Sequence, residues 1–311
     1  MSEMYPPAAF LIGHGTRSAT GLSQLRQFAE QVSAQRRDIP VGLGIIEHAE
    51  PDLDDGIDML LGSDPLIASG SRQLVAVPLV LLGAGHLKDD GPQALARARR
   101  RHPHLDAAYA PALGVHPAVL DVAADRACEA GGAETDAVVL VGRGSSDPDA
   151  NADLHKVARL LADGRGLGMG AGGATADQPS PSLGLVEPAF VSLAEPGVAG
   201  ALGRCHRLGA RSITVQPYFL FRGVLMDRIA SEALEWEREH AGCRVLIGRE
   251  LSPDPRLHAL VWHRYDQARS GTATMNCDCC VYRAGIHGGS GVAYAGPAIG
   301  IGARRLGGAS A

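Results

Sequence analysis

The sequence is poor in aromatic residues, carries no excess of positive charge and contains no long apolar run. Phe, Trp and Tyr make up only 4% of its 311 residues, whereas apolar residues together make up 45%, so its cores must be packed mainly with aliphatic side chains. A formal net charge of −5 argues against a nucleic-acid partner, which would favour a basic face. The longest apolar run, 74–82, is too short to span a membrane and contains a proline. We therefore expect neither nucleic acid nor a membrane among the partners.

Several well-known local signals are also missing. The first ten residues, MSEMYPPAAF, lack the basic segment of a secretory signal, so we expect a cytoplasmic protein. Neither G-x-x-x-x-G-K-[ST] nor G-x-S-x-G occurs, so neither a P-loop nor a serine-hydrolase elbow is supported. The match to G-x-G-x-x-G from Gly168 to Gly173 follows a predicted helix instead of a strand. We therefore interpret it as a loop and not as a dinucleotide site.

Short apolar runs, which predict buried strands, alternate along the chain with amphipathic segments, which predict helices. In the first half the predicted strands are 8–12, 41–46, 74–82 and 106–110, and the predicted helices are 22–35, 52–61, 93–101 and 118–129. In the second half the strands are 137–141, 182–186, 212–221 and 244–247, and the helices are 152–163, 197–208, 225–240 and 256–268. Strands that alternate with helices predict a parallel sheet covered on both faces.

The two halves look like copies of one unit. Four landmarks recur at spacings of 129 to 140 residues, namely Gly13 and Gly142, Glu47 and Glu187, Pro78 and Pro217, and Pro117 and Pro255. A Gly-rich insertion within 164–181 explains why the first spacing is smaller than the others. A nearly constant offset indicates internal duplication. We expect an α/β fold with two duplicated parallel-sheet domains, 1–133 and 134–270, facing each other across a cleft, followed by a Cys- and Gly-rich tail, 271–311.

Three polar side chains follow the ends of different predicted strands in the first half. His14 ends the first strand, Glu47 ends the second, and the third leads through Gly83-Ala84-Gly85 to His86. The carboxyl ends of parallel strands meet at one edge of a sheet, where ligands bind. Two imidazoles and a carboxylate at that edge suggest a site for a first-row divalent metal and a base near neutral pH. Glu50 remains an alternative carboxylate, and His48 is expected to point to the opposite face of the sheet.

The second half lacks both imidazoles at the matching positions. Its counterparts of His14, Glu47 and His86 are predicted to be Arg143, Glu187 and Val224. Such an edge cannot repeat the metal chemistry, but with Arg222 and Arg228 it can bind anions. We expect this half to act as a scaffold or clamp.

Together these segments resemble the sirohydrochlorin chelatases, class II enzymes that insert cobalt or iron into the isobacteriochlorin precursor of cobalamin and sirohaem. The resemblance covers about residues 8–268 and rests on LIGHGTRS (11–18), GIIEHAEPDLDDG (44–56), VPLVLLGAGHLKDD (77–90) and VLVGRGSSDPDAN (139–151). It implies that His14 and His86 bind the metal, that Glu47 is the active-site carboxylate and that no ATP is needed. Because sirohydrochlorin carries many carboxylates, it also implies a set of cationic contacts, for which the candidates are Arg17, Arg72, Lys88, Arg143, Arg222 and Arg228.

The tail has a different character. Met275-x-Cys277-x-x-Cys280 resembles a motif of some long members of this family that is associated with an iron–sulfur cluster. Clusters prefer four thiolates, and the tail offers only three, Cys277, Cys279 and Cys280. A fourth ligand could come from a second subunit or from His287, Cys128, Cys205 or Cys243. The alternative is a thiol patch that is unoccupied or holds zinc. The protein is expected to be a monomer of two fused halves or a homodimer, joined in the latter case through this tail.

Three alternatives stay open at the level of sequence. The metal can be iron or cobalt, because both accept the same ligands. We favour iron for sirohaem synthesis, because a stand-alone ferrochelatase is the commoner need in GC-rich genomes. The enzyme can instead serve another tetrapyrrole or a metal such as Ni²⁺. A metal-delivery protein without enzymatic activity would carry the same histidines, but it would not need a cleft lined with arginines.

Overall fold

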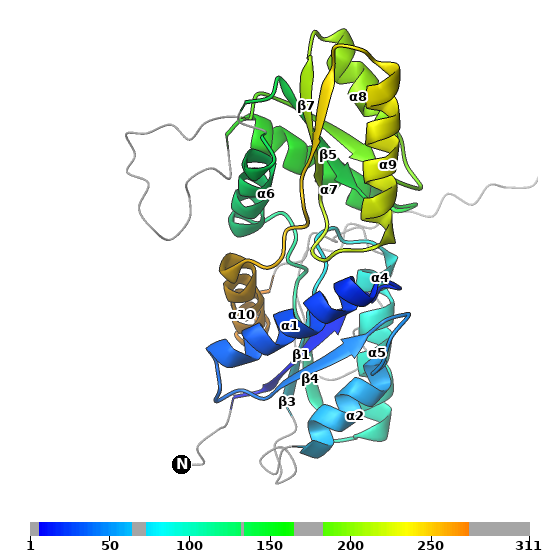
Figure 1. The fold of residues 1–311 in the computed structure, drawn as a ribbon. Helices are drawn as coiled ribbons and strands as arrows, with labels where there is room; N and C mark the ends of the chain where they lie inside the picture. Colours follow the sequence, from blue (N-terminus) through cyan, green and yellow to red (C-terminus); the bar gives the residue numbers. More distant parts are fainter. Residues whose placement is uncertain (1–5, 64–72, 132–133, 165–182, 274–311) are drawn as a thin grey trace, which may run out of the picture. The chain divides into compact units, whose positions relative to one another are not determined.

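The computed structural model describes residues 6–63, 73–131, 134–164 and 183–273. In the first half, four parallel strands pair in the order β2-β1-β3-β4. The strands are β1 (Ala8–Gly13), β2 (Val41–Ile45), β3 (Gln73–Pro78) and β4 (Asp106–Tyr109) (Figure 1). The helices are α1 (Ala19–Gln35), α2 (Leu53–Ser63), α4 (Gly85–Lys88), α5 (Asp90–Arg101) and α6 (Pro117–Glu129).

The second half repeats this topology, with strand order β6-β5-β7-β8. Its strands are β5 (Ala137–Gly142), β6 (Leu185–Phe190), β7 (Ser212–Pro217) and β8 (Arg244–Ile247). Its helices are α7 (Pro148–Ala162), α8 (Val198–Arg207), α9 (Val224–Glu239) and α10 (Pro255–Arg269). The predicted fold class and the internal duplication are confirmed. No helix in the described part of the chain is long and apolar enough to cross a membrane.

Local sequence explains where several helices begin. Helices α6, α7 and α10 each start with a proline in the first turn, preceded by a side chain that accepts a hydrogen bond from a backbone N–H of that turn. The capping residues are His116, Asp147 and Asp254. Proline suits this position because its missing N–H would have no partner within the helix, and the cap satisfies one of the remaining donors.

The third strand of each half is shorter than predicted. Strands β3 and β7 end at Pro78 and Pro217, whereas the apolar runs continue to residues 82 and 221. The run after Pro78 is apolar because Leu79 and Leu81 are buried in the core, not because the strand continues. Strand β6 lies later than predicted, at Leu185–Phe190, and the short helix α4 was not predicted.

The last helix of each half packs on the other half. Helix α6 contacts α7 and β7, whereas α10 contacts α1, β3 and β4 (Figure 1). Trp262 of α10 donates a hydrogen bond to the Val32 carbonyl of α1 over 3.1 Å, and Arg36 at the end of α1 pairs with Asp266 over 2.5 Å. One continuous apolar cluster therefore includes residues of both sheets together with α6 and α10.

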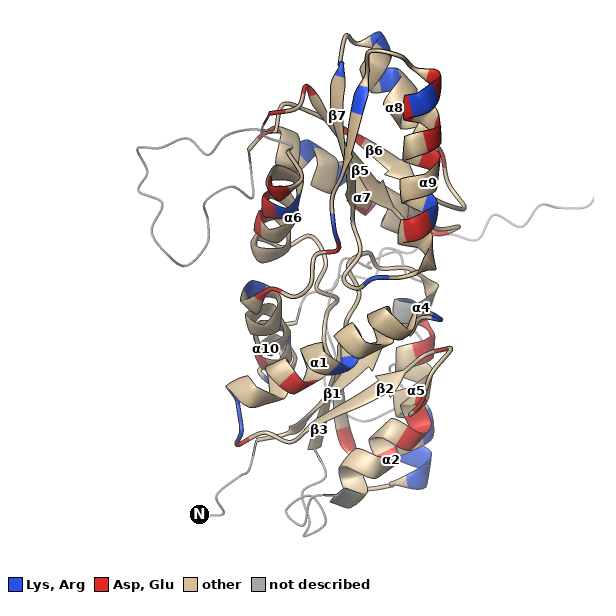
Figure 2. Ribbon diagram, viewed as in Figure 1, with Lys and Arg blue, Asp and Glu red and all other residues tan. Residues whose placement is uncertain are grey.

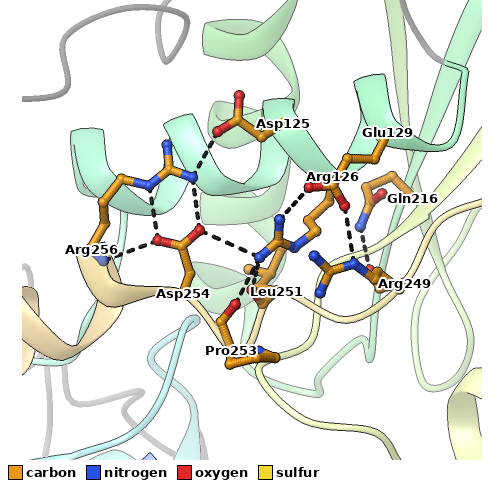
Figure 3. Close-up of polar contacts among 9 residues, drawn as sticks. All are labelled: Asp125, Arg126, Glu129, Gln216, Arg249, Leu251, Pro253, Asp254 and Arg256. Atoms are coloured by element: carbon orange, nitrogen blue, oxygen red, sulfur yellow. Dashed lines mark hydrogen bonds and ion pairs between the residues drawn. The ribbon is translucent and has the colours of Figure 1, made fainter. Parts of the chain in front are cut away.

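A buried arginine of α6 fixes the segment in which the chain passes from the second sheet to α10, the helix that packs on the first half. Arg126 of α6 is only 4% exposed, and its guanidinium donates to the carbonyls of Leu251 and Pro253 and to Asp254 (Figure 3). Asp254 also caps α10 and pairs with Arg256. The segment that carries the chain from β8 into α10 is thereby fixed to α6. The predicted boundary near residue 133 separates the two sheets along the chain. Each sheet is nevertheless covered in part by a helix from the other half, so a sheet and the helices packed on it do not form one continuous segment of sequence.

Candidate active site

His14 and Glu47 meet at the carboxyl edge of the first sheet. Beyond the ends of β1 and β2, the backbone N–H of Ile46 donates to Gly13 and that of Glu47 donates to His14, which keeps the two segments side by side. Gly15, at φ 89°, permits this approach, because a Cβ there would clash with the Glu47 carbonyl oxygen. The side chains then lie together, with His14 Nδ1 3.4 Å from Glu47 Oε1. The predicted convergence of these two residues is what the structure shows.

His48 joins the same carboxylate, contrary to the expectation that it would face away. Strand β2 ends at Ile45, and His48 takes a left-handed backbone conformation with φ 67°. The alternation of side chains along a strand no longer applies there. His48 Nε2 lies 3.4 Å from Glu47 Oε1, the same oxygen that His14 approaches. The carboxylate therefore contacts two imidazoles, and all three side chains are about one-third exposed.

Arg143 extends this group into the second half. Its Nη1 lies 3.1 Å from His14 Nε2. A guanidinium can only donate, so His14 Nε2 accepts, and the ring proton sits on Nδ1, facing the Glu47 carboxylate. Glu47, His14 and Arg143 form a line of polar contacts that joins the edges of the two sheets. The hydrogen bond from Arg143 also assigns the tautomer of the imidazole.

His86 lies in α4, which follows the carboxyl end of β3. Its side chain is outside the described part of the structure, so the His14–His86 metal pair stays a prediction. Among the side chains that are described, no three His, Cys, Asp or Glu residues are arranged to hold a metal ion.

Lys88, two residues beyond His86, is tied to the second half. Its Nζ lies 2.5 Å from Asp147 and 3.2 Å from Asp149, and the side chain is only 10% exposed. Burial alone would lower the pKa of Lys88, but the hydrogen bonds to the two carboxylates outweigh it and raise the pKa. As a substrate contact, Lys88 would first have to leave both carboxylates.

The counterpart of Glu47 in the second half is Ser192, not Glu187. Val191 donates to Gly142 and Ser192 donates to Arg143, which repeats the hydrogen bonds of Ile46 and Glu47. Glu187 lies in the middle of β6, opposite Val139, and its carboxylate pairs with Arg204 over 2.8 Å. The sequence signal for the correct alignment was the Ala-Glu-Pro that occurs at 49–51 and again at 194–196. The second half has therefore lost the carboxylate as well as the imidazoles.

The other cationic residues predicted to contact the substrate differ in whether they form ion pairs within the protein. Arg222 pairs with Asp227 and Arg228 pairs with Glu232, each over less than 3 Å and each largely exposed. Arg17 is exposed, and Arg72 lies outside the described residues. Helix α5 carries basic residues and the neighbouring helix α2 carries acidic ones (Figure 2). Arg97 and Arg101 of α5 form ion pairs with Asp54 and Asp58 of α2.

Two further sets of candidates from the sequence are Glu50, the alternative carboxylate, and the cysteines of the tail. Glu50 lines a surface depression with Pro51 and three residues of α2, Asp55, Asp58 and Met59, whereas Glu47 has the two imidazoles. This favours Glu47 as the functional carboxylate. The tail cysteines Cys277, Cys279 and Cys280 lie outside the described residues.

The sequence matches the CbiX family model twice, over residues 8–130 and 137–268. It is 31% identical to the sirohydrochlorin cobaltochelatase of Priestia megaterium over 295 residues, which cover 92% of this chain and 88% of that protein. It is 30% identical to a sirohydrochlorin ferrochelatase from the same organism, over 73% of this chain and 78% of that protein.

Solved structures with the same fold include two of the sirohydrochlorin chelatase SirB. The enzyme from Bacillus subtilis subspecies spizizenii in complex with cobalt superposes with a TM-score of 0.65 at 24% identity, covering 86% of this chain and 96% of that chain. SirB from Bacillus subtilis with Fe³⁺ gives a TM-score of 0.68 at 24% identity, covering 86% and 97%.

Proposed function

This chain belongs to the CbiX family, and we propose that it is a sirohydrochlorin chelatase, an enzyme that inserts Fe²⁺ or Co²⁺ into sirohydrochlorin without ATP. The observation that carries the proposal is the placement of His14 against Glu47 at the carboxyl edge of the first sheet, with Nε2 of the ring turned toward the second half. This arrangement provides a ligand for a divalent ion and a base beside it.

In the proposed reaction the metal ion is a substrate, and it replaces the pyrrole N–H protons of the ring. His14 Nε2 and, by resemblance to the family, His86 hold the ion while leaving positions for the ring nitrogens. The Glu47 carboxylate orients the His14 ring through Nδ1, as carboxylates commonly do for metal-bound imidazoles. Glu47 is also the proposed acceptor of the released protons. His48, which is partly exposed, contacts the same carboxylate.

The exposed arginines are proposed to bind the carboxylates of the tetrapyrrole. Arg143 is the best placed, because it already lies beside His14. Arg17, Arg222 and Arg228 are exposed further candidates, and Arg is well suited to carboxylates because its planar fork donates two parallel hydrogen bonds. For Lys88, which is buried between two carboxylates, we propose a role in holding α4 against the start of α7.

The relatives include enzymes named for iron and enzymes named for cobalt, so they leave the choice between the two metals open. In Priestia megaterium, the cobaltochelatase matches 92% of this chain and the ferrochelatase matches 73%. The first match must extend beyond Ser270 into the tail, because a stretch of that length cannot fit in the preceding residues. Metal insertion should therefore be tested with both Co²⁺ and Fe²⁺, with Co²⁺ first.

An iron–sulfur cluster in the tail remains a proposal that rests on three cysteines within four residues. Two of the candidate fourth ligands are unsuitable, since Cys205 and Cys243 are buried in the apolar core of the second half. Burial raises the pKa of Cys205 to about 12 and also raises that of Cys243, which opposes the thiolate form that binds iron. Cys128, His287 and a second subunit stay open. The cytoplasmic location likewise stays a prediction.

Incubation of the purified protein with sirohydrochlorin and Co²⁺ or Fe²⁺, without oxygen and without ATP, tests the function. We expect the absorption spectrum of the tetrapyrrole to change to that of its metal complex faster than in the same mixture lacking protein. A protein that binds Co²⁺ but does not accelerate insertion would instead be a metal-delivery protein. Faster insertion of Ni²⁺ than of either ion would point to the nickel alternative.

A further inference from the structure

Arg143 occupies the atom of His14 that a metal ion needs. The ring proton of His14 is on Nδ1, so Nε2 carries the only lone pair through which this neutral imidazole can coordinate. That lone pair accepts the hydrogen bond from Arg143 over 3.1 Å. A metal ion cannot bind there while this contact persists. The guanidinium also places a fixed positive charge beside the position of a divalent cation, which electrostatic repulsion disfavours.

Arg143 differs from three of the other candidate cations at this edge. Lys88, Arg222 and Arg228 each pair with a carboxylate of the protein, but Arg143 has no carboxylate partner among the described residues. It is exposed, and its remaining N–H groups can bind a carboxylate from outside. A polyanionic ligand would therefore attract Arg143 more strongly than a neutral imidazole does, since hydrogen bonds between two charged groups are the stronger ones.

The duplication places this arginine where it is. Arg143 follows β5 as His14 follows β1, so the residue that the second half carries in place of the metal-binding histidine contacts that histidine. Both positions lie before a glycine with positive φ, Gly15 or Gly144, whose backbone packs against the neighbouring segment. The backbone position of Arg143 is therefore set by the fold, and the residue is exposed.

We propose that Arg143 is a gate on the metal site, closed on His14 in the free protein and opened when a carboxylate of the tetrapyrrole takes the guanidinium. The proposal rests on the proposed function, because it assigns the order in which the two substrates of that site bind. The tetrapyrrole strengthens metal binding by removing Arg143, and by linkage the metal strengthens tetrapyrrole binding. The ion is thus held firmly only when the ring that receives it is present.

The direct test is the affinity for Co²⁺ in the absence of any tetrapyrrole, measured by competition with a fluorescent chelator. We expect Arg143→Ala to bind Co²⁺ about tenfold more tightly than the wild type, because both a charge-assisted hydrogen bond and a repulsive charge are removed. Arg143→Gln, which keeps an N–H donor without the charge, should lie between the two. Arg204→Ala is the matched control, since it removes an ion-paired arginine of the same half, and its affinity should equal that of the wild type.

Two outcomes would overturn the gate. Unchanged or weaker Co²⁺ binding by Arg143→Ala would show that the guanidinium does not compete with the metal. A His14→Ala variant that retains wild-type affinity would show that the ion is not bound at His14. Neither result depends on whether the wild type inserts metal into sirohydrochlorin, so failure of the gate is distinguishable from failure of the proposed function.

Steady-state kinetics provide a second measurement. In the wild type, the KM for Co²⁺ should fall as the sirohydrochlorin concentration rises, whereas in Arg143→Ala it should be low throughout. If the KM for Co²⁺ changed with sirohydrochlorin concentration to the same extent in both proteins, the proposed order of binding would be contradicted.

Discussion

His48 and Leu193 occupy the same place in the two halves, and both hold the backbone in the left-handed region, at φ values of 67° and 61°. Each is the residue after the counterparts Glu47 and Ser192, and each is followed by Ala-Glu-Pro. The conformation is therefore a property of the duplicated unit, but only the first half places an imidazole there. Leu193 is 68% exposed, whereas His48 contacts the Glu47 carboxylate.

We expect His48→Leu to fold normally and to insert metal more slowly. The second half shows that leucine is accepted at this backbone position, while the substitution removes one of the two imidazoles that hold Glu47. Loss of a group that orients an active-site residue typically costs about tenfold or more. The measurement is kcat for cobalt insertion, beside the thermal melting temperature. Leu193→Ala is the control, and it should leave kcat unchanged. Wild-type kcat in His48→Leu would remove His48 from the site.

His14→Ala and His86→Ala should each abolish metal insertion without unfolding the protein. His14 is partly exposed beyond the end of β1, and His86 lies in the short helix α4 beyond β3, so neither residue sits within a strand of the sheet. Insertion is followed by the absorption of sirohydrochlorin, and folding is followed by circular dichroism. If one variant kept near wild-type turnover, the assignment of that histidine as a metal ligand would be wrong.

Arg126→Met should lower the free energy of unfolding by about 3 kcal/mol, the cost typical of breaking a buried ion pair. The substitution leaves the carbonyls of Leu251 and Pro253 without this donor at the crossing from β8 to α10. Urea unfolding measures the effect. Arg249→Ala removes a nearby exposed ion pair with Glu129 and should cost about 1 kcal/mol or less. Equal losses in the two variants would show that the buried arginine does not hold the helix exchange.

Stability should decrease below neutral pH, in part through His116. Burial, together with Arg264 and His263 of α10, lowers the pKa of His116 to about 4 from its usual 6.5. Between these values the unfolded chain binds a proton that the folded protein does not, so stability is present above pH 6.5 and falls as the pH drops toward 4.

His116→Asn retains a helix-capping side chain but removes this proton. Its melting temperature should therefore fall less than that of the wild type between pH 7 and pH 5. His104→Asn, which replaces an exposed histidine, is the control. A pH dependence of His116→Asn identical to that of the wild type would rule out this contribution.

A chain ended at Ser270 should remain active. Helix α10, the last to pack on the first sheet, ends at Arg269, and the three proposed reactive residues lie in the first half. Purified without oxygen, the full-length protein should be brown and contain iron and sulfide, whereas the shortened protein should be colourless yet insert metal into sirohydrochlorin. A shortened protein that is folded but inactive would make Cys277 and Cys280 part of the mechanism.

The sequence by itself determined the elements and their repetition. Strands and helices follow from local periodicity, and prolines such as Pro117 and Pro255 mark the same helix start in both halves. The placement of His14 and Glu47 at one edge also followed from sequence, because the ends of adjacent parallel strands must meet. The family resemblance arose from these same segments, since the residues that make the site lie in short loops next to the strands.

Tertiary structure alone decided which side chains touch. The left-handed φ of His48 turns its side chain to the opposite side from the one that strand alternation predicts, and no local sequence pattern predicts this φ. The repeated Ala-Glu-Pro signals that Ser192 corresponds to Glu47, but only the backbone hydrogen bonds of Val191 and Ser192 establish this, because Glu187 offers a matching residue type at a different place. The contact of Arg143 with His14 joins positions that are 129 residues apart. Such contacts depend on register and on the packing of one half against the other, and these are properties of the folded chain and not of any local segment.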